Sequence, residues 1–539
     1  MASAAPTVSR RARIPRLEAI LDNRWAIALY VLGLLLVSGV MRTLALGEAL
    51  WMDEGLSIGL ASQPLFDIPG DLRQDGNPPL YYMLLHVWIQ IFGNGPAETQ
   101  AMSVAIALLA VPIGLWAGWS LFGRRAGLIA AALGALNPFL TTYAQETRMY
   151  SLMVVLSIAL TAAFVHVYIF RNRRYLPVFG VVLALMLYTH SWGLFMTFGA
   201  LVAFGAAVLE MEREGRRDLI RDGLLGFGIA LLLYLPWIPT LLYQAGHTGA
   251  PWVNPPRFGV IVQLTKWILG GGTVTVALLL AGGSGIAAIV ALARRRAAER
   301  DPQAVREYRA VIAVAVLGVT TLAVAWLVSQ FAPAWTTRYL GVALGPLIVI
   351  ACLGLARAGN LGLVALVVIM GVWAVPKTSQ LENKSNAADL GEAAAEVLEA
   401  GDLVVVLQPE QTPLIEYHLR DEVPGLRWAN QLGAVENPDL MDWRDGLERM
   451  EDATPEENLA PLLASLPRSA RVLLVHPVTT QRNDWDAPWT ELVRRRSAQW
   501  GRAMEEDPRF TRSDDAVPEF YRRANRIGVR GVLYTKTGA

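Results

Sequence analysis

The sequence predicts a polytopic α-helical membrane protein that ends in a small α/β domain. Of its 539 residues, 54% are hydrophobic and only 17% are charged, which excludes an ordinary soluble protein. After residue 376 the composition changes, because charged residues become frequent and short apolar runs alternate with helical stretches. We therefore expect a cytoplasmic N-terminal segment (1–24), a transmembrane domain (25–376) and an extracytoplasmic α/β domain (377–539).

The transmembrane segments are placed by their length and by the charge of the loops. About 20 apolar residues cross a bilayer as a helix, and basic residues collect in cytoplasmic loops. Five arginines precede the first segment, which is too long for a signal peptide and lacks a cleavage site, so the N-terminus is expected inside. With about eleven spans, every heavily basic loop, including 210–222, falls on that side. The predicted spans are 25–46, 101–122, 126–143, 151–170, 175–192, 193–209, 224–243, 264–293, 310–331, 340–356 and 361–375.

The first outer loop, residues 47–79, is acidic and leads into a short apolar segment. It contains six carboxylates and one basic residue, Arg73. The segment that follows, 79–93, is too short to span and opens with Pro78 and Pro79. We predict an interfacial helix there, because a full span would place the arginine-rich loops outside.

The C-terminal domain is predicted from three buried strands and a helix. The strands are expected at 402–408, 471–476 and 529–534, and the helix at 488–505, which indicates a parallel or mixed sheet. No nucleotide motif or zinc-ligand spacing occurs in this domain, so we expect it to pack on the membrane part or to hold an acceptor. The single cysteine, Cys352, excludes an intrachain disulfide, and the balance of 47 basic and 46 acidic residues gives no sign of a nucleic-acid partner.

Charged residues gather in three outer loops that the predicted topology places on one face. They are the pair Asp53 and Glu54, the stretch 145–148 and the stretch 336–339. Charges beside lipid are costly unless they are paired or functional. One interpretation is ion pairing, of Glu146 with Arg148 or Arg338. The other is that the arginines hold an anionic phosphate while a carboxylate handles a proton.

Five motifs in a fixed order carry a resemblance to a known family. They are WMDEG, GNPPLYYMLLHVW, GRRAGLIAAALGALNPFLTTYAQETRMYSL, YTHSWGLF and TTRYLG. In this order they resemble the bacterial relatives of protein O-mannosyltransferases and of lipid A aminoarabinose transferases, in the C-type superfamily of membrane glycosyltransferases. The resemblance covers roughly residues 25–350 and leaves the C-terminal domain outside. It implies a polyprenyl-phosphate sugar donor, interfacial helices in the first outer loop and inversion at the anomeric carbon.

The resemblance also implies roles for catalytic residues. Asp53 matches the general base that takes a proton from the acceptor hydroxyl, and Glu54 matches a neighbour that orients the acceptor or the base. Glu146 matches the acidic position of the second outer loop. From the sequence alone, a retaining scheme with two carboxylates stays open.

The donor phosphate is expected to meet Arg148, Arg338 and Tyr339. The family commonly has histidine before the Pro-Pro pair, and this chain has Asn77, which does not ligate a metal as imidazole does. Whether the protein needs a divalent metal is therefore left open, and no other cofactor is expected.

Five residues are candidates for binding substrate. His190 lies at the tip of a predicted hairpin, and its alternative role is packing or hydrogen bonding. The alternative for Lys266 is that its side chain extends to the membrane interface. The candidates are Asn77, Tyr81, Tyr82, His190 and Lys266.

The predicted function is glycosyl transfer at the outer face of a bacterial plasma membrane. The donor would be a polyprenyl-phosphate sugar, and the acceptor a hydroxyl of an envelope glycan, lipid or protein. A transporter or flippase of lipid-linked envelope precursors is the alternative, although no internal repeat or mid-span charge favours it. A membrane-anchored binding protein that works through its α/β domain is a third interpretation.

Overall fold

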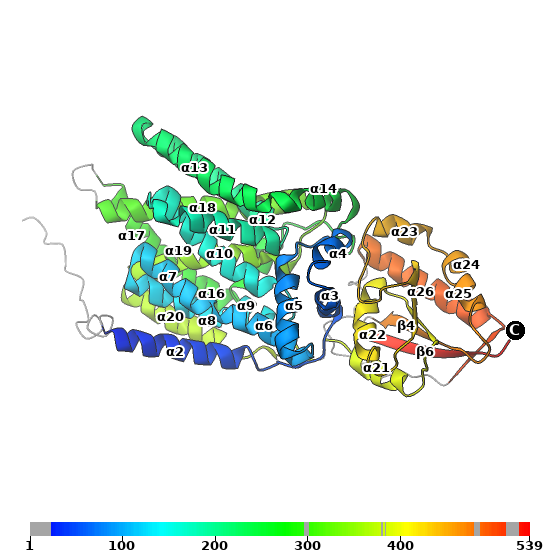
Figure 1. Ribbon diagram of the computed structural model, residues 1–539. Coiled ribbons are helices and arrows are strands. Elements are labelled where there is room, and N and C mark those ends of the chain that lie inside the picture. The colour runs from blue at the N-terminus through cyan, green and yellow to red at the C-terminus, as the bar shows by residue number, and fades with distance from the viewer. Residues whose placement is uncertain are drawn as a thin grey trace, which may run out of the picture.

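The computed structural model describes residues 23–295, 301–378, 381–382, 384–478, 486–513 and 528–538. The predicted N-terminal segment, 1–24, therefore lies almost wholly outside the described residues. Figure 1 shows a long helical body joined at one end to a smaller domain that contains a sheet, with the short helices α3, α4 and α5 at the junction. The predicted fold class is confirmed.

The first half of the helical body starts at the N-cap residue Asn23, whose Oδ1 accepts a hydrogen bond from the Trp25 amide at 2.9 Å. Large apolar side chains of α2 are exposed, Leu29 at 68% and Leu36 at 62%, as expected for a helix that faces lipid. The helices are α2 (Arg24–Met41), α3 (Met52–Ser62), α4 (Ile68–Asp75), α5 (Leu80–Phe92), α6 (Pro96–Leu108), α7 (Ala110–Phe122), α8 (Arg124–Leu136), α9 (Pro138–Tyr143), α10 (Tyr150–Phe164), α11 (Leu176–Thr189) and α12 (Gly193–Glu210).

The second half of the body contains one helix that the sequence did not predict in full. Residues 210–222 were expected to be a loop, but α13 begins at Arg213. Asp222 is buried in this helix and forms ion pairs with Arg173 (2.7 Å) and Arg171 (3.1 Å). These pairs neutralise its charge, so the carboxylate can be buried within a helix. The helices are α13 (Arg213–Tyr234), α14 (Ile238–His247), α15 (Val260–Gln263), η4 (Leu264–Ile268), α16 (Gly272–Ala277), α17 (Gly283–Ala293), α18 (Pro302–Val328), η7 (Thr337–Ala343), α19 (Leu344–Arg357) and α20 (Asn360–Trp373).

The predicted count of about eleven spans is not confirmed. Within the described ranges, eight helical segments are long and apolar enough to cross a membrane. The predicted spans 126–143, 175–192 and 361–375 form shorter helices, and the first of them is divided at Asn137 and Pro138, because proline has no amide to continue the ladder. The eight segments are Arg24–Met41, Pro96–Phe122, Tyr150–Ile169, Gly193–Glu210, Arg213–His247, Gly272–Ala293, Pro302–Val328 and Thr337–Arg357.

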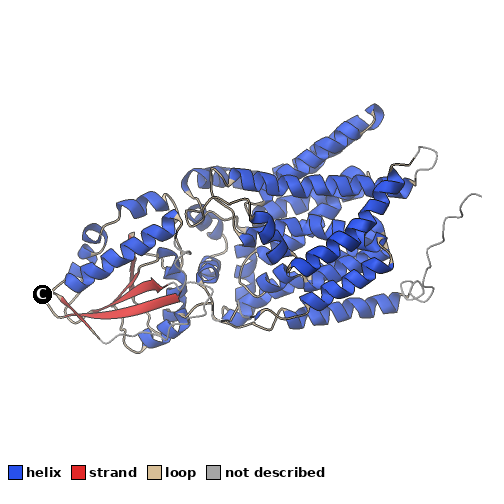
Figure 2. Cartoon of the chain, turned by 180° about the vertical axis from the view of Figure 1, so that it is seen from behind, coloured by secondary structure: helices blue, strands red, loops and turns tan. Residues whose placement is uncertain are grey.

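The C-terminal domain is a mixed sheet with helices on both faces, as Figure 2 shows. The strand order is β3-β2-β1-β4-β6-β5, in which β1 is parallel to both neighbours and β6 is antiparallel to both of its own. The three predicted strands correspond to β1, β4 and β6, and the predicted helix to α26; β2, β3 and β5 were not predicted. The strands are β1 (Leu403–Val406), β2 (Arg427–Asn430), β3 (Gly433–Val435), β4 (Arg471–Val478), β5 (Phe510–Arg512) and β6 (Gly528–Lys536), and the helices are α21 (Ala387–Ala395), η9 (Pro409–Gln411), α22 (Thr412–Leu419), α23 (Gly446–Asp452), α24 (Pro455–Asn458), α25 (Ala460–Ala464) and α26 (Pro488–Glu506).

Helix α3 packs into this C-terminal domain although it belongs to the first outer loop. Leu50, just before the helix, and Ile58 join the apolar core formed by α21, α22 and one face of the sheet. Leu56 joins a second cluster with Trp443 and Trp489. The helix that begins with the predicted catalytic pair is therefore held between the helical body and the α/β domain (Figure 1).

Candidate active site

The candidate site is built around the first turn of α3. Asp53 and Glu54 lie in this turn, where the helix dipole favours negative charge. The Glu54 carboxylate also accepts a hydrogen bond from the Trp51 amide at 3.3 Å and so caps the helix start. The WMDEG motif therefore forms the start of α3 and fixes the main chain that carries both carboxylates.

Glu54 is wholly buried and connects three separate segments. Its Oε1 accepts hydrogen bonds from the Thr147 amide (2.9 Å) and from Gln100 Nε2 (3.2 Å). Its Oε2 forms an ion pair with Lys384 Nζ at 2.7 Å, and neither side chain has any exposed surface. Both oxygens already have partners, which favours a role for Glu54 in orienting the loop over direct contact with an acceptor.

Asp53 forms the ion pair that joins the first and last of the three predicted loops. Its Oδ2 lies 2.7 Å from Arg338 Nη1, and the two side chains are 12% and 17% exposed. The guanidinium also lies over the rings of Trp51 (5.5 Å) and Tyr339 (5.9 Å). The ion-pairing interpretation considered Glu146 as a partner of Arg148 or Arg338, and in the structure Arg338 pairs with Asp53.

The second outer loop reaches the same helix turn through Arg148. Its Nη1 donates hydrogen bonds to the main-chain oxygen of Asp53 (3.2 Å) and to Ser57 Oγ (3.0 Å). Glu146 is buried in the same loop, and its main-chain oxygen accepts a hydrogen bond from the Arg148 amide at 2.7 Å. The three predicted loops thus meet at one place, with two arginines and several carboxylates.

Tyr82 and Asn77 lie beside a carboxylate that the sequence did not single out, Asp75. Asn77 Nδ2 donates to Asp75 Oδ2 at 2.6 Å. Burial raises the pKa of the Asp75 carboxyl above its ordinary value, and the Asp53 carboxylate acts in the same direction, so the two acids are near neighbours. The Tyr82 hydroxyl is buried, and no described residue forms a hydrogen bond with it. Asp75 lies two residues before Asn77 in DGNPP, and this closeness in the sequence could have identified it as a candidate site residue.

The remaining candidates differ in how close they come to this cluster. Tyr81 is fully buried, and its hydroxyl lies 3.1 Å from Ser103 Oγ. His190 packs against Tyr339 with the ring centroids 4.5 Å apart, and its Nδ1 accepts a hydrogen bond from the Trp192 amide at 3.1 Å. Lys266 is exposed and lies over the Trp267 ring, and no contact among the described residues joins it to Asp53.

His190 is neutral at physiological pH. Burial, together with the positive charges of Arg148 and Arg338, lowers the pKa of its imidazole from the ordinary 6.5 to about 3. A neutral imidazole can offer a hydrogen bond to a substrate, but it cannot supply a positive charge for a phosphate.

The C-terminal domain adds a carboxylate, Glu410, in the turn that follows β1. Its Oε1 accepts a hydrogen bond from Gln408 Nε2 at 2.7 Å, and both of its oxygens lie 3.1 Å from Trp489 Nε1. Burial raises the pKa of the Glu410 carboxyl, and Asp53 contributes in the same direction. Sequence reasoning missed Glu410 and Lys384, because both are more than three hundred residues from Asp53 and neither lies in a motif.

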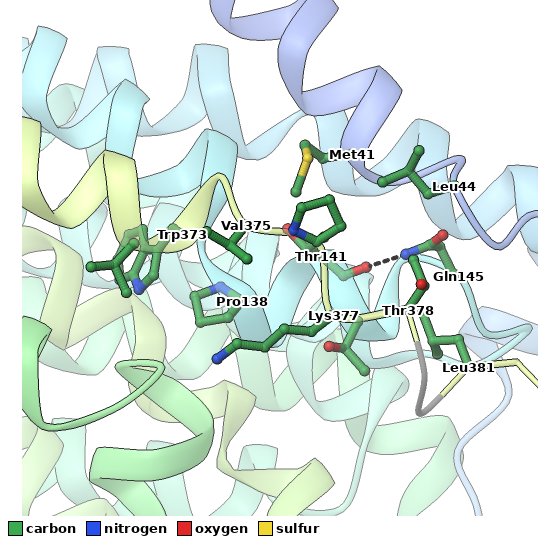
Figure 3. A pocket seen from close by; sticks show the side chains of 13 residues that line it. Met41, Leu44, Pro138, Thr141, Gln145, Trp373, Val375, Lys377, Thr378 and Leu381 are labelled. Atoms are coloured by element: carbon green, nitrogen blue, oxygen red, sulfur yellow. Dashed lines mark hydrogen bonds between the residues drawn. The ribbon is translucent and has the colours of Figure 1, made fainter.

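A pocket adjoins the second outer loop between the ends of α2, α9 and α20, as Figure 3 shows. Its lining is mostly apolar, with Met41, Leu44 and Trp373, and includes the cation Lys377. Gln145 closes one side, where its Nε2 donates to the main-chain oxygen of Thr141 at 3.0 Å (Figure 3). As for a metal, no three His, Cys, Asp or Glu side chains in the described part of the chain are grouped so that they could hold one.

Comparisons with known proteins bear on the sequence family and on the fold. Residues 76–240 match the family model described as dolichyl-phosphate-mannose-protein mannosyltransferase. The chain is also similar to the crystal structure of ArnT from Cupriavidus metallidurans in the apo state, with a TM-score of 0.53, 12% identity, and coverage of 94% of this chain and 97% of that one. This likeness shows that the chain has the fold of ArnT.

Two further structures with this fold contain lipid phosphates. ArnT from the same organism bound to undecaprenyl phosphate matches with a TM-score of 0.52 and 14% identity, over 94% of this chain and 97% of that one. The archaeal oligosaccharyltransferase AglB from Archaeoglobus fulgidus, in complex with an inhibitory peptide and a dolichol-phosphate, matches with a TM-score of 0.50 and 12% identity, over 84% and 70%. No curated protein sequence matches the chain.

The likeness in fold extends further than the motifs do. The motifs resemble the C-type family over roughly residues 25–350, and the C-terminal domain was expected to lie outside the resemblance. A match over 94% of the chain must include most of that domain, so the likeness in fold reaches beyond the part of the chain that carries the motifs. The α/β domain belongs to the shared fold.

Proposed function

We propose that this chain is a membrane glycosyltransferase that moves a sugar from a polyprenyl-phosphate donor to an acceptor hydroxyl at the outer face of the membrane. The observation that carries the proposal is the contact of the Asp53 carboxylate with Arg338, 2.7 Å apart, while Arg148 binds the same helix turn. A base beside two cations is what displacement of a phosphate from an anomeric carbon requires. The family match and the lipid phosphates in two structures with this fold support the choice of donor.

In the proposed reaction, Asp53 takes the proton of the acceptor hydroxyl as its oxygen attacks the anomeric carbon. The bond between that carbon and the phosphate oxygen breaks, and its electron pair leaves with the polyprenyl phosphate. Arg338 and Arg148 stabilise the charge that develops on the departing oxygen. One displacement of this kind inverts the anomeric centre, and Glu146 is the second acidic residue proposed to contribute.

The ion pair between Asp53 and Arg338 supports an order of events. Without a donor, the guanidinium is occupied by the carboxylate. The donor is a phosphodiester with one negative charge, as a carboxylate has, and its acceptor oxygens can compete with Asp53 for Arg338. When it does, Asp53 is released to accept the proton of the acceptor hydroxyl, and donor binding thereby prepares the base.

Three polar groups near Asp53 are suited to hold sugar hydroxyls. The Tyr82 hydroxyl is buried and without a hydrogen-bond partner in the described structure, and Asp75 and Glu410 are carboxyls with raised pKa. The buried Tyr82 hydroxyl needs a partner, which a bound sugar can supply, and the two carboxyls can form further hydrogen bonds to its hydroxyls. We assign the acceptor broadly to a hydroxyl of an envelope glycan, lipid or protein, in the plasma membrane of a bacterium, with the N-terminus cytoplasmic and the α/β domain outside.

The test is sugar transfer by the purified protein from undecaprenyl-phosphate mannose, galactose, arabinofuranose and aminoarabinose to envelope extracts. We expect the wild type to release undecaprenyl phosphate from one of these donors and Asp53→Asn to release it on the order of 10²- to 10⁴-fold more slowly. Asp67→Asn is the matched control, because Asp67 is an exposed acid of the same loop. A folded Asp53→Asn protein with unchanged transfer would remove Asp53 from the mechanism. Movement of labelled donor across proteoliposomes without release of phosphate would favour the flippase alternative.

A further inference from the structure

The buried ion pair between Glu54 and Lys384 ties the predicted catalytic turn to the C-terminal domain. We propose that Lys384 is a positioning residue for Asp53, and that the α/β domain sets the geometry of the catalytic turn through it. This inference rests on the proposed function, because it assigns Lys384 to the site at which transfer would occur.

The pair is enclosed on all sides. Lys384 Nζ lies 2.7 Å from Glu54 Oε2 and 3.5 Å from the main-chain oxygen of Gln145, and both side chains of the pair are fully buried. Removing two charges from water is costly unless their geometry is good and their other hydrogen bonds are satisfied. Glu54 meets that condition through Gln100 and Thr147, so the ammonium holds the carboxylate, and with it the second outer loop, in one arrangement.

The backbone beside Lys384 is fastened to the sheet of the C-terminal domain. Two residues further on, the side-chain amide of Asn386 donates to the Val529 oxygen (2.9 Å) and accepts from the Val529 amide (2.8 Å) at the start of β6. The Ser385 hydroxyl accepts a hydrogen bond from the Ala387 amide, at the first residue of α21. A buried path therefore runs from β6 through Asn386 and Lys384 to Glu54.

The same domain also packs on the far side of the catalytic helix. Gly55 faces α22 so closely that a Cβ added there would lie 2.8 Å from Leu414 Cα, and one turn later Gly59 faces the main-chain oxygen of Asp439. Helix α3 is therefore placed by the α/β domain as well as by the helical body. Asp53 precedes Glu54 in the chain, so any displacement of Glu54 moves the proposed base relative to Arg338.

The inference is tested by kinetics with Lys384→Met. Misplacement of a catalytic group by about 1 Å can cost on the order of 10²-fold in rate, so we expect kcat per folded molecule to fall by about that factor with the donor KM little changed. Lys536→Met is the matched control, because Lys536 is a buried lysine of the same domain that donates to the oxygens of Leu463 and Leu466 and lies in β6. Its kcat per folded molecule should equal that of the wild type.

A double variant distinguishes positioning through Glu54 from an independent effect of Lys384. If Lys384 acts through Glu54, the variant Glu54→Gln with Lys384→Met should lose no more activity than the more impaired single variant. Losses that multiply, or a kcat of Lys384→Met equal to that of the wild type, would overturn the inference.

Hydrogen exchange supplies a readout that does not depend on activity. Deuterium uptake in peptides covering residues 51–62 should rise in Lys384→Met and stay at the wild-type level in Lys536→Met. Unchanged uptake in Lys384→Met overturns the inference even if transfer is observed. If the wild type transfers no sugar while uptake rises as expected, the proposed function fails and the tie between the domain and the catalytic turn stands.

Discussion

At the scale of single residues, the candidate site combines charged groups whose environments differ. Asp53 and Arg338 neutralise one another at 2.7 Å, whereas Asp75 and Glu410 are buried beside the site with carboxyls of raised pKa. The arrangement places a carboxylate paired with a guanidinium beside buried carboxyl groups that are suited to hydrogen-bond a sugar.

His190 provides a pH-dependent prediction. The folded protein holds its pKa near 3, whereas the unfolded chain has the ordinary 6.5, so below pH 6.5 the unfolded state binds more protons than the folded state. The stability that this neutral imidazole contributes is fully present above pH 6.5 and is lost as the pH falls toward 3. In a thermal unfolding series, His190→Asn should therefore lose less stability than the wild type on acidification, by at most about 1.4 kcal/mol per pH unit.

Asparagine is the appropriate substitute because its Oδ1 can replace the Nδ1 that accepts from the Trp192 amide. At pH 8 both proteins have a neutral side chain at this position, so their difference there measures packing alone. Parallel stability curves from pH 8 to pH 4 would contradict the prediction.

At the scale of elements, α3 is the part of the structure on which the site depends. It is a short helix with Asp53 and Glu54 in its first turn and glycine at positions 55 and 59, one turn apart. These glycines allow the main chain of the α/β domain to approach closely, in the manner of small residues at packed helix interfaces. The helix therefore forms the contact between the chemistry and the C-terminal domain.

Substitution of the second glycine tests this packing. Gly59→Ala places a Cβ against the main-chain oxygen of Asp439, which cannot move without shifting the domain, so we expect destabilisation of about 1–3 kcal/mol and reduced transfer. The measurements are thermal unfolding and proteolysis between the helical body and the α/β domain. Gly39→Ala in α2 is the control, because a Cβ there meets no atom within 4 Å and replacing a helical glycine should be neutral or stabilising. Equal melting temperatures for Gly59→Ala and the wild type would show that the contact is not close.

At the scale of the whole molecule, the site lies at one end of the helical body, where the α/β domain covers α3 (Figure 1). The arginine-rich start of α13 belongs to the loops that the charge rule places in the cytoplasm. The lipid phosphate of the donor would lie at the membrane surface on the opposite side, within reach of Arg338. The orientation is a prediction from charge, and it determines which face of the membrane receives the sugar.

Cysteine labelling in intact cells tests the orientation. The native Cys352 is fully buried, so a single introduced cysteine should be the reactive one. We expect an impermeant maleimide to label Glu399→Cys in the α/β domain and to leave Glu214→Cys in α13 unlabelled until the cells are opened; both positions are exposed. The opposite pattern would place the α/β domain and the proposed site in the cytoplasm.

The sequence by itself determined the local elements with strong hydrophobic signals. Long apolar runs predict helices because burying each of them in lipid is worth many kcal/mol, and 79–93 was correctly expected to form a short helix, observed as α5. The continuous apolar runs of β1, β4 and β6 were also sufficient to predict these three strands. The short strands β2, β3 and β5 lack such runs and were not predicted. The topology predicted from span length and loop charge placed Asp53, Arg148 and Arg338 on one face, but the count of spans depended on kinks such as that at Asn137.

Only the tertiary structure decided which charges meet. Asp53 pairs with Arg338 across 285 positions, and Glu54 pairs with Lys384 across 330. Lys384 and Glu410 carry no local pattern, because a polar side chain becomes part of a site only when two distant surfaces dock and exclude water around it. Apolar periodicity is a property of neighbouring residues, whereas a buried ion pair is a property of the assembled fold.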